Sequence, residues 1–223
     1  NLAGLSHEAE DLESLETAMT IVEPTMGVWP MKAPAKVESV AIDFVKGRAV
    51  AINGEKLAPF DLLVAANRIA GRNGIGLSHA LENRIIGTKS RGVYEAPGMT
   101  LLGQALRYVY QAVLDKRATT MFGELSRFVG VQIYEGRYYD LATEAAFAAL
   151  ETYAKHASGT VELGLYKGNI LFQSLTGVKA SLYFEADASM EASDGLNPVS
   201  SQGFAEIQSV EARSMAKAGQ VKA

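Results

Sequence analysis

The chain has 223 residues, 48% of them hydrophobic, and can therefore bury a substantial core as one large domain or two closely joined units. Its formal net charge of -4 argues against a general nucleic-acid binder, because neutralising phosphates requires a basic face. The absence of cysteine excludes disulfides, thiolate metal ligands and cysteine nucleophiles, and is typical of a reducing compartment, so the cytoplasm is the default location. No apolar run approaches the roughly 18 residues of a membrane span, and we expect neither membrane association nor export.

The first part of the chain, Leu2 to Pro34, mixes acidic residues with glycine and proline and keeps no helical or strand period. We expect an irregular, partly extended lead-in with Trp29 as its anchor. Because the chain begins at Asn1 and not at an initiator Met, we also expect it to be part of a longer polypeptide.

Alternating apolar residues follow from Val37 onward and indicate antiparallel strands. Turns are predicted at Lys46-Gly47 and at Asn53-Gly54, because asparagine and glycine both tolerate a positive φ. The alternation runs through Val40, Ile42 and Phe44, then through Ala49 to Ile52.

Four segments carry apolar residues at helical spacing. The first begins at Pro59, which suits the first turn of a helix, and is expected to stop at Gly71. The other three are Thr100 to Arg117, Met121 to Ile133 and Thr143 to His156.

A second strand pair is predicted for Thr160 to Tyr166 and Ile170 to Leu175, joined at a Lys-Gly-Asn turn. Asp187 to Ser201 is typical of a loop, and Gly203 to Ala218 is expected to be a strand that enters an exposed amphipathic helix. The predicted class is α+β, with small antiparallel sheets and several amphipathic helices.

The stretch from Asn67 to Gly98 combines glycines with charged and hydrogen-bonding residues and looks like one site. Its glycines fit neither the Walker phosphate loop nor the dinucleotide fingerprint. A purely structural role, as a helix stop followed by a tight turn, is therefore the alternative to a ligand-binding role. The three histidines are too dispersed for a metal site. The residues of interest are Gly71, Gly74, Gly76, Glu82, Arg84, Lys89, Arg91 and Tyr94.

Three phrases in this stretch, NRIAGRNGIG, ENRIIG and KSRGVYEAPG, resemble argininosuccinate synthase. The similarity continues upstream in SHEAEDLE and downstream in LYKGN, so it covers nearly the whole chain. The family joins citrulline to aspartate through a citrullyl-adenylate and converts ATP to AMP and pyrophosphate. The resemblance therefore implies a ligase of arginine biosynthesis.

The resemblance also implies residue roles. It places citrulline contacts at Ser6, Glu8, Glu82 and Tyr94, where carboxylates accept from N–H groups and hydroxyls serve the carboxylate or ureido oxygen. Lys89 and Arg91 are candidates either to face an anion or to serve the fold. We assign no catalytic residue, since family chemistry rests on orientation and charge stabilisation.

Two departures from the family pattern limit what this chain can do. Asn73 stands where the family usually has histidine, which leaves the role of that position open. The pyrophosphate loop is absent, so ATP with its Mg²⁺, and aspartate, are expected to bind mainly to an N-terminal domain that this chain lacks. Family enzymes are homotetramers, and we divide the chain into a citrulline-side domain, 1–202, and an oligomerisation tail, 203–223.

The resulting hypothesis is a synthase fragment that has no ligase activity alone. A stand-alone oligomerisation or regulatory module with the same fold, and an unrelated small-molecule binder, are the alternatives.

Overall fold

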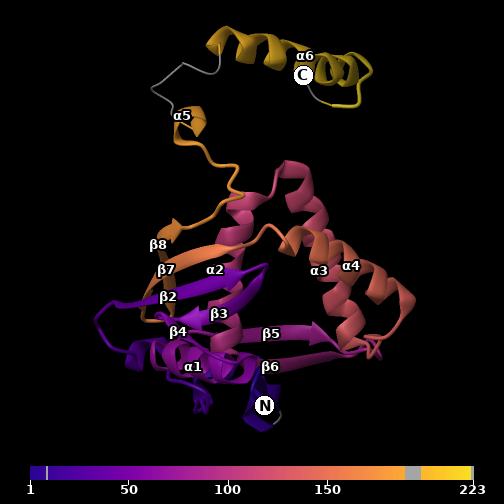
Figure 1. Cartoon of the computed structure of the whole chain (residues 1–223). Helices are drawn as coiled ribbons and strands as arrows, with labels where there is room; N and C mark the ends of the chain where they lie inside the picture. The colour runs from indigo at the N-terminus through magenta and orange to yellow at the C-terminus, as the bar shows by residue number, and fades with distance from the viewer. Residues whose placement is uncertain (9, 189–196, 222–223) are drawn as a thin grey trace. The chain divides into compact units, whose positions relative to one another are not determined.

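The computed structural model describes residues 1–8, 10–188 and 197–221. The chain divides into two compact units, Asn1–Leu182 and Tyr183–Ala223. The described residues form six α-helices and two antiparallel sheets, which confirms the α+β class (Figure 1). Within that part of the chain, no helix is long and apolar enough to span a membrane.

The larger sheet has five strands in the order β4-β3-β2-β7-β8, and all neighbours are antiparallel. The predicted alternation and turns are confirmed, with φ of 52° at Asn53 and 80° at Gly54. The strands are β2 (Glu38–Val45), β3 (Arg48–Ile52), β4 (Glu55–Lys56), β7 (Gly159–Tyr166) and β8 (Asn169–Thr176).

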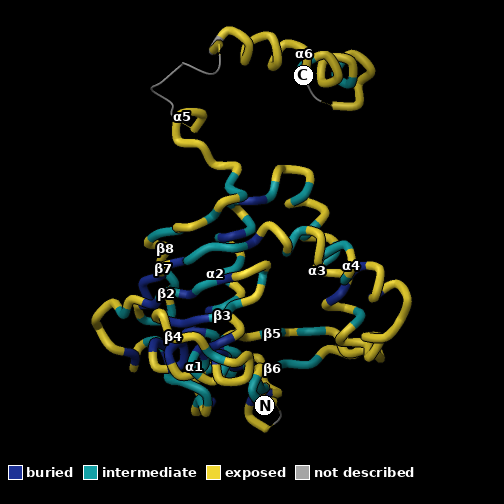
Figure 2. Tube along the Cα trace, in the orientation of Figure 1, coloured by how far each residue is buried: buried dark blue, intermediate teal, exposed yellow. Residues whose placement is uncertain are grey.

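Two helices, α1 (Pro59–Arg72) and α2 (Pro97–Val113), pack on this sheet and bury the main core. Figure 2 shows the buried segments concentrated there. Because one face of each helix and one face of the sheet are apolar, burying them together removes the largest continuous apolar surface from water. The core includes Val40, Ile42, Phe44, Leu62, Ala66, Ile69, Leu101, Ala105, Val109, Val161, Leu163 and Leu165.

The expected stop of α1 at Gly71 is one residue early, because the helix ends at Arg72 with Asn73 as its C-cap, and the chain then turns at Gly74, where φ is +72°. Gly71 is there for packing: a Cβ at this position would collide with the backbone of Met26 and Gly27, and Val28 N donates to Gly71 O at 3.1 Å. This glycine therefore lets the lead-in lie against the helix, and its role is neither a helix stop nor a ligand contact but close packing of two backbone segments.

The segment Thr100 to Arg117, expected to be one helix, contains parts of two helices. The first, α2, ends at Val113, and the second, α3 (Lys116–Tyr134), begins three residues later. The break is set by Asp115, whose side chain accepts from the backbone N–H groups of Arg117 and Ala118 as an N-cap. The fourth helix, α4 (Leu141–Ala154), pairs with α3.

The smaller sheet has three strands in the order β1-β6-β5. We did not predict its hairpin from the glycine-rich stretch. The strands are β1 (Leu5–His7), β5 (Leu77–Asn83) and β6 (Lys89–Glu95).

The lead-in is irregular, as predicted, and contains three short 3₁₀ helices: η1 (Glu10–Glu13), η2 (Met19–Ile21) and η3 (Pro30–Lys32). It covers one face of the smaller sheet, where a second core forms around Trp29 and Val93.

The second unit contains α5 (Glu185–Ala188) and α6 (Pro198–Lys217). The expected strand at the start of 203–218 is wrong, because the segment is helical from Pro198 with Asn197 as its N-cap. Position 203, where we divided the chain, lies inside α6. The loop expected at 187–201 falls largely on 189–196, outside the described residues, while its last residues belong to α6.

Candidate functional site

The central strand of the smaller sheet, β6, sends alternate side chains to two different faces. Arg91, Val93 and Glu95 lie on the face covered by the lead-in, which we call the covered face. Ser90 and Tyr94 lie on the opposite face, which we call the open face. Tyr94 pairs in register with Ser6 of β1, and Ser90 pairs with Glu82 of β5.

The open face brings together the four residues to which the family resemblance gave citrulline contacts. Ser6 Oγ donates to Glu8 Oε1 at 3.1 Å, and the hydroxyl of Tyr94 donates to Glu82 Oε1. Arg84 of the β5-β6 turn forms an ion pair with Glu8, with 3.3 Å between Nη2 and Oε2. The four residues thus form two hydrogen-bonded pairs contributed by three strands and their ends.

Three of these residues, Glu8, Glu82 and Tyr94, line a shallow cavity of about 490 Å³. This volume lies within the range of about 300–1,000 Å³ that is usual for small-molecule sites. Ser6 does not line this cavity but donates to Glu8, which does. The remaining lining residues are Arg84, Ile85, Ile86, Ser90 and Tyr134.

Glu82 holds the proton on Tyr94. The hydrogen bond to Glu82, then burial, then the negative charges of Glu82 and Glu8, raise the pKa of Tyr94 to about 12. Tyr94 is therefore a neutral phenol at physiological pH and keeps its O–H as a donor. The carboxylate of Glu82 keeps acceptor capacity for a ligand, since a carboxylate accepts up to about four hydrogen bonds.

Gly92 is a site residue that we missed. A Cβ at this position would lie 3.0 Å from Cε2 of Tyr94 and 3.6 Å from Cγ of Glu8. The absence of a side chain therefore lets the Tyr94 ring lie over the strand and reach Glu82. The motif around it was visible in the sequence, but only the structure shows that Gly92 lies against both Tyr94 and Glu8.

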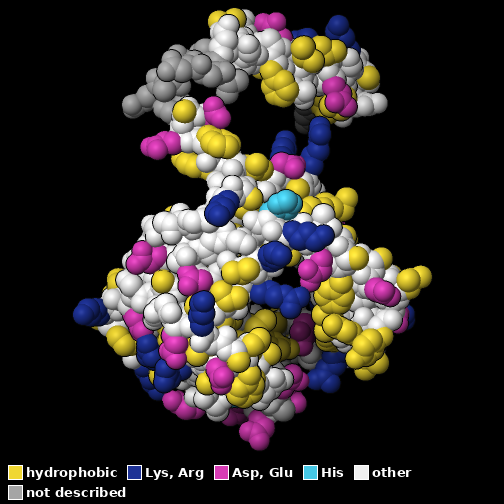
Figure 3. Space-filling model, in the orientation of Figure 1, with side chains coloured by type: hydrophobic (Ala, Val, Ile, Leu, Met, Phe, Trp, Pro, Cys, Tyr) yellow, Lys and Arg dark blue, Asp and Glu magenta, His cyan; other side chains and the backbone are white. Residues whose placement is uncertain are grey.

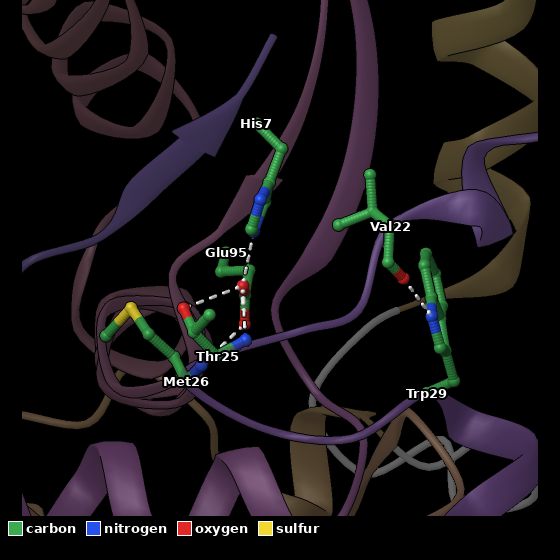
Figure 4. A network of polar contacts seen from close by, with 6 residues as sticks. All are labelled: His7, Val22, Thr25, Met26, Trp29 and Glu95. Atoms are coloured by element: carbon green, nitrogen blue, oxygen red, sulfur yellow. Dashed lines mark hydrogen bonds and ion pairs between the residues drawn. The ribbon is translucent and has the colours of Figure 1, made fainter. Parts of the chain in front are cut away.

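The covered face is organised by Glu95, whose side chain is 2% exposed. Its Oε1 accepts from His7 Nε2 at 2.6 Å, from Thr25 N at 2.8 Å and from Thr25 Oγ1 at 3.2 Å (Figure 4). Its Oε2 accepts from Met26 N at 2.8 Å. Burial raises the pKa of Glu95, but the hydrogen bonds outweigh burial and hold its pKa below the usual value.

The same network orients the site. His7 lies between Ser6 and Glu8 in sequence and points to the covered face, so its bond to Glu95 fixes the short strand β1 against β6. Trp29 anchors the lead-in, as predicted, by burying its ring and donating from Nε1 to Val22 O at 2.8 Å (Figure 4). The bond of His7 to Glu95 holds the segment from which Ser6 and Glu8 reach the open face, whereas Trp29 holds the lead-in on the covered face.

The two basic candidates, Lys89 and Arg91, have different surroundings. Arg91 donates to the carbonyl oxygens of Leu12, Ser14 and Thr17, and its Nε donates to His79 Nε2 at 2.9 Å. Its guanidinium is therefore used to hold the lead-in, which favours the structural reading of this residue.

Lys89 is exposed, and among the described residues its amine forms no ion pair. It lines a second cavity of about 290 Å³ beside Glu13, Arg84 and Arg91.

Asn73 lies at the end of α1, where it joins the helix to β2. Its Nδ2 donates to Glu38 Oε2 at 2.7 Å and to Ile69 O at 2.9 Å, and the residue is 1% exposed. Arg72 also pairs with Glu38, and its hydrogen bond lowers the pKa of that carboxyl against the opposing effect of burial. In this chain the position therefore serves a buried polar contact between α1 and the larger sheet.

The family follows from comparison with known proteins. The model of the arginosuccinate synthase C-terminal domain matches residues 1–215, and the chain belongs to this family. An argininosuccinate synthase of Rhodopirellula baltica is 39% identical over 214 residues, which are 96% of this chain and 53% of that protein. One of Lachnoclostridium phytofermentans is 36% identical over 205 residues, 92% of this chain and 50% of that protein. The chain thus spans about half the length of these curated relatives.

Proposed function

We propose that this chain forms the citrulline side of an argininosuccinate synthase, a ligase of arginine biosynthesis that joins citrulline and aspartate by way of a citrullyl-adenylate. The observation that carries the proposal is the convergence of Ser6, Glu8, Glu82 and Tyr94 on the open face of one small sheet. Ser6 and Glu8 lie at least 74 positions from Glu82 and Tyr94 in the sequence, and none of the four belongs to the main core.

Their chemistry suits an amino acid with a ureido group. Glu82 has one phenolic donor and further acceptor capacity, so it can accept from the ammonium group of citrulline. Glu8 already pairs with Arg84 and Ser6, and this pair offers both donors and acceptors to the polar ends of the substrate. In this role the chain binds and orients citrulline, and the residues that activate its ureido oxygen lie elsewhere.

We assign the nucleotide and aspartate to a part of the enzyme beyond this chain. The sequence contains no pyrophosphate loop, and within the described ranges no three His, Cys, Asp or Glu side chains gather to hold a metal ion. We therefore propose that ATP with its Mg²⁺ binds mainly outside this chain, and that the chain alone is inactive. The proposed location is the cytoplasm.

We further propose that the active form is a homotetramer to which α6 contributes. In support, α6 exposes large apolar side chains along a helix of 20 residues. Such side chains gain from burial in an interface. They include Val199, Phe204, Ile207 and Val210.

The proposal is tested by pyrophosphate release from ATP that depends on both citrulline and aspartate. It is measured on the product of the full reading frame that encodes this sequence and on the 223-residue chain. We expect activity in the first and none in the second. Glu82→Gln in the active protein should raise the KM for citrulline, whereas the matched control Glu55→Gln, on exposed β4, should not.

Absence of activity in both proteins would overturn the synthase proposal in favour of a non-catalytic module with the same fold. Activity in the short chain would overturn the assignment of ATP to another part of the enzyme.

A further inference from the structure

Tyr134, the last residue of α3, lies at the wall of the cavity on the open face. It comes from the pair of helices α3 and α4, which we call the helical layer, whereas Glu8, Glu82 and Tyr94 come from the small sheet. Exposed apolar side chains are common over α3 and α4, on the right of Figure 3, but Tyr134 is the member that lines this cavity beside Glu82. The sequence around Tyr134 does not identify it as a site residue, since it ends an ordinary amphipathic helix.

The ring of Tyr134 is not held by the fold. Its side chain is 57% exposed, and its hydroxyl donates to no other group in the part of the chain that the structure describes. The neighbouring Tyr138 differs, because its ring packs against Phe147 with 5.4 Å between ring centroids. An exposed aromatic ring at a cavity wall contributes little to folding and remains available for a ligand.

The charge of the cavity indicates what that ligand group is. Glu8 is neutralised by Arg84 at 3.3 Å, whereas Glu82 has only the neutral phenol of Tyr94 as a partner among the described residues. The carboxyl-terminal end of α3 adds a partial negative charge near Tyr134. One uncompensated carboxylate beside two tyrosine rings is the arrangement that favours an ammonium group, through ion pairing and cation–π attraction.

We propose that Tyr134 is a substrate-contacting residue that, together with Glu82, recognises the α-ammonium group of citrulline. This inference rests on the proposed function and adds a recognition element from the helical layer. Glu82 supplies the opposite charge, and the Tyr134 ring covers the ammonium and excludes water from it. The contribution comes from the ring, so the hydroxyl is dispensable.

The test compares Tyr134→Ala, Tyr134→Leu and Tyr134→Phe in the product of the full reading frame. We expect the KM for citrulline to rise on the order of 5-fold in the Ala and Leu variants and to stay within about 2-fold in the Phe variant. The KM for aspartate and for ATP should not change. Tyr139→Ala is the matched control, since Tyr139 is 93% exposed and does not line the cavity.

A citrulline analogue without the α-amino group sharpens the result. Wild type and Tyr134→Ala should bind this analogue equally, because the group that the ring recognises is missing. Urea unfolding of each variant shows whether the fold is retained, and Tyr134→Leu keeps the apolar bulk if Tyr134→Ala does not fold.

An unchanged citrulline KM in Tyr134→Ala and Tyr134→Leu, with a raised KM in Glu82→Gln, would overturn the role of Tyr134 and leave the proposed function standing. An unchanged KM in all three would overturn the proposed function itself. Loss of affinity in Tyr134→Phe equal to that in Tyr134→Ala would overturn the role of the ring.

Discussion

Glu95 and Glu82 lie on adjacent strands of one small sheet, yet their carboxylates are used in opposite ways. Glu95 is buried on the covered face and accepts four hydrogen bonds from three residues. Glu82 lies at a cavity on the open face and accepts one, from Tyr94. The number of protein donors thus separates a carboxylate that stabilises the fold from one that has capacity for a ligand.

The largest effect is expected from removing the buried carboxylate. Glu95→Ala would leave the N–H groups of Thr25 and Met26 without acceptors and release His7, so the free energy of unfolding should fall by about 3 kcal/mol or more. Urea unfolding of the wild type and the variant measures it. Glu55→Ala, an exposed change, should stay within about 0.5 kcal/mol of wild type. A loss of similar size in both variants would show that the hydrogen bonds of Glu95 stabilise the fold no more than an exposed carboxylate does.

The next effect separates the two basic candidates. Arg91→Met removes the donors to three lead-in carbonyls and should lower the free energy of unfolding by about 2 kcal/mol. Lys89→Met should change it by less than about 0.5 kcal/mol, since this side chain is exposed. Thermal unfolding of both variants provides the comparison. Equal stability of the two would show that Arg91 does not hold the lead-in.

A smaller effect is expected on the stability of the protein at low pH. Because the pKa of Glu95 is lower in the folded state than its usual 4.5, its contribution to stability is complete above that pH. It is lost as the pH falls through the lowered value, since the unfolded chain then binds more protons. Glu95→Gln should therefore lose less stability than wild type between about pH 5 and about pH 3. A wild-type acid profile in this variant would contradict the assigned cause.

The smallest effect is spectroscopic. With a pKa raised to about 12, Tyr94 should ionise after an ordinary tyrosine, whose pKa is near 10. Stability from this proton is present below the ordinary value and is lost as the pH rises toward the folded value. The late component of an ultraviolet titration should disappear in Tyr94→Phe and move to lower pH in Glu82→Gln. A late component that persists in Tyr94→Phe would assign it to another group.

Local patterns in the sequence predicted the larger sheet better than the smaller one. Strands such as β2 alternate apolar and polar residues because one face, with Val40 and Ile42, is buried in the main core. The hairpin of β5 and β6 lacks such a pattern, since its open face carries Tyr94 and Glu82 and its covered face carries Arg91 and Glu95. A strand that carries polar side chains on both faces gives no periodic signal.

The candidate site shows the same limit. The resemblance located Ser6, Glu8, Glu82 and Tyr94, and the structure brings them to one face. Gly92 needed the close approach of Tyr94 and Glu8, and Tyr134 needed the cavity wall that it shares with Glu82, because neither residue is distinguished by local sequence. Conversely, Gly71 looked like a ligand-facing glycine and is a packing contact with Gly27.

The most direct test of the account is a titration with citrulline of the wild-type product of the full reading frame and of its Glu82→Gln variant, with urea unfolding of both. We predict that Glu82→Gln weakens citrulline binding by about 10- to 100-fold, the loss of a hydrogen bond to a charged group, and leaves stability within about 0.5 kcal/mol of wild type. Unchanged citrulline affinity in this variant would contradict the claim that the open face of the small sheet is the substrate site.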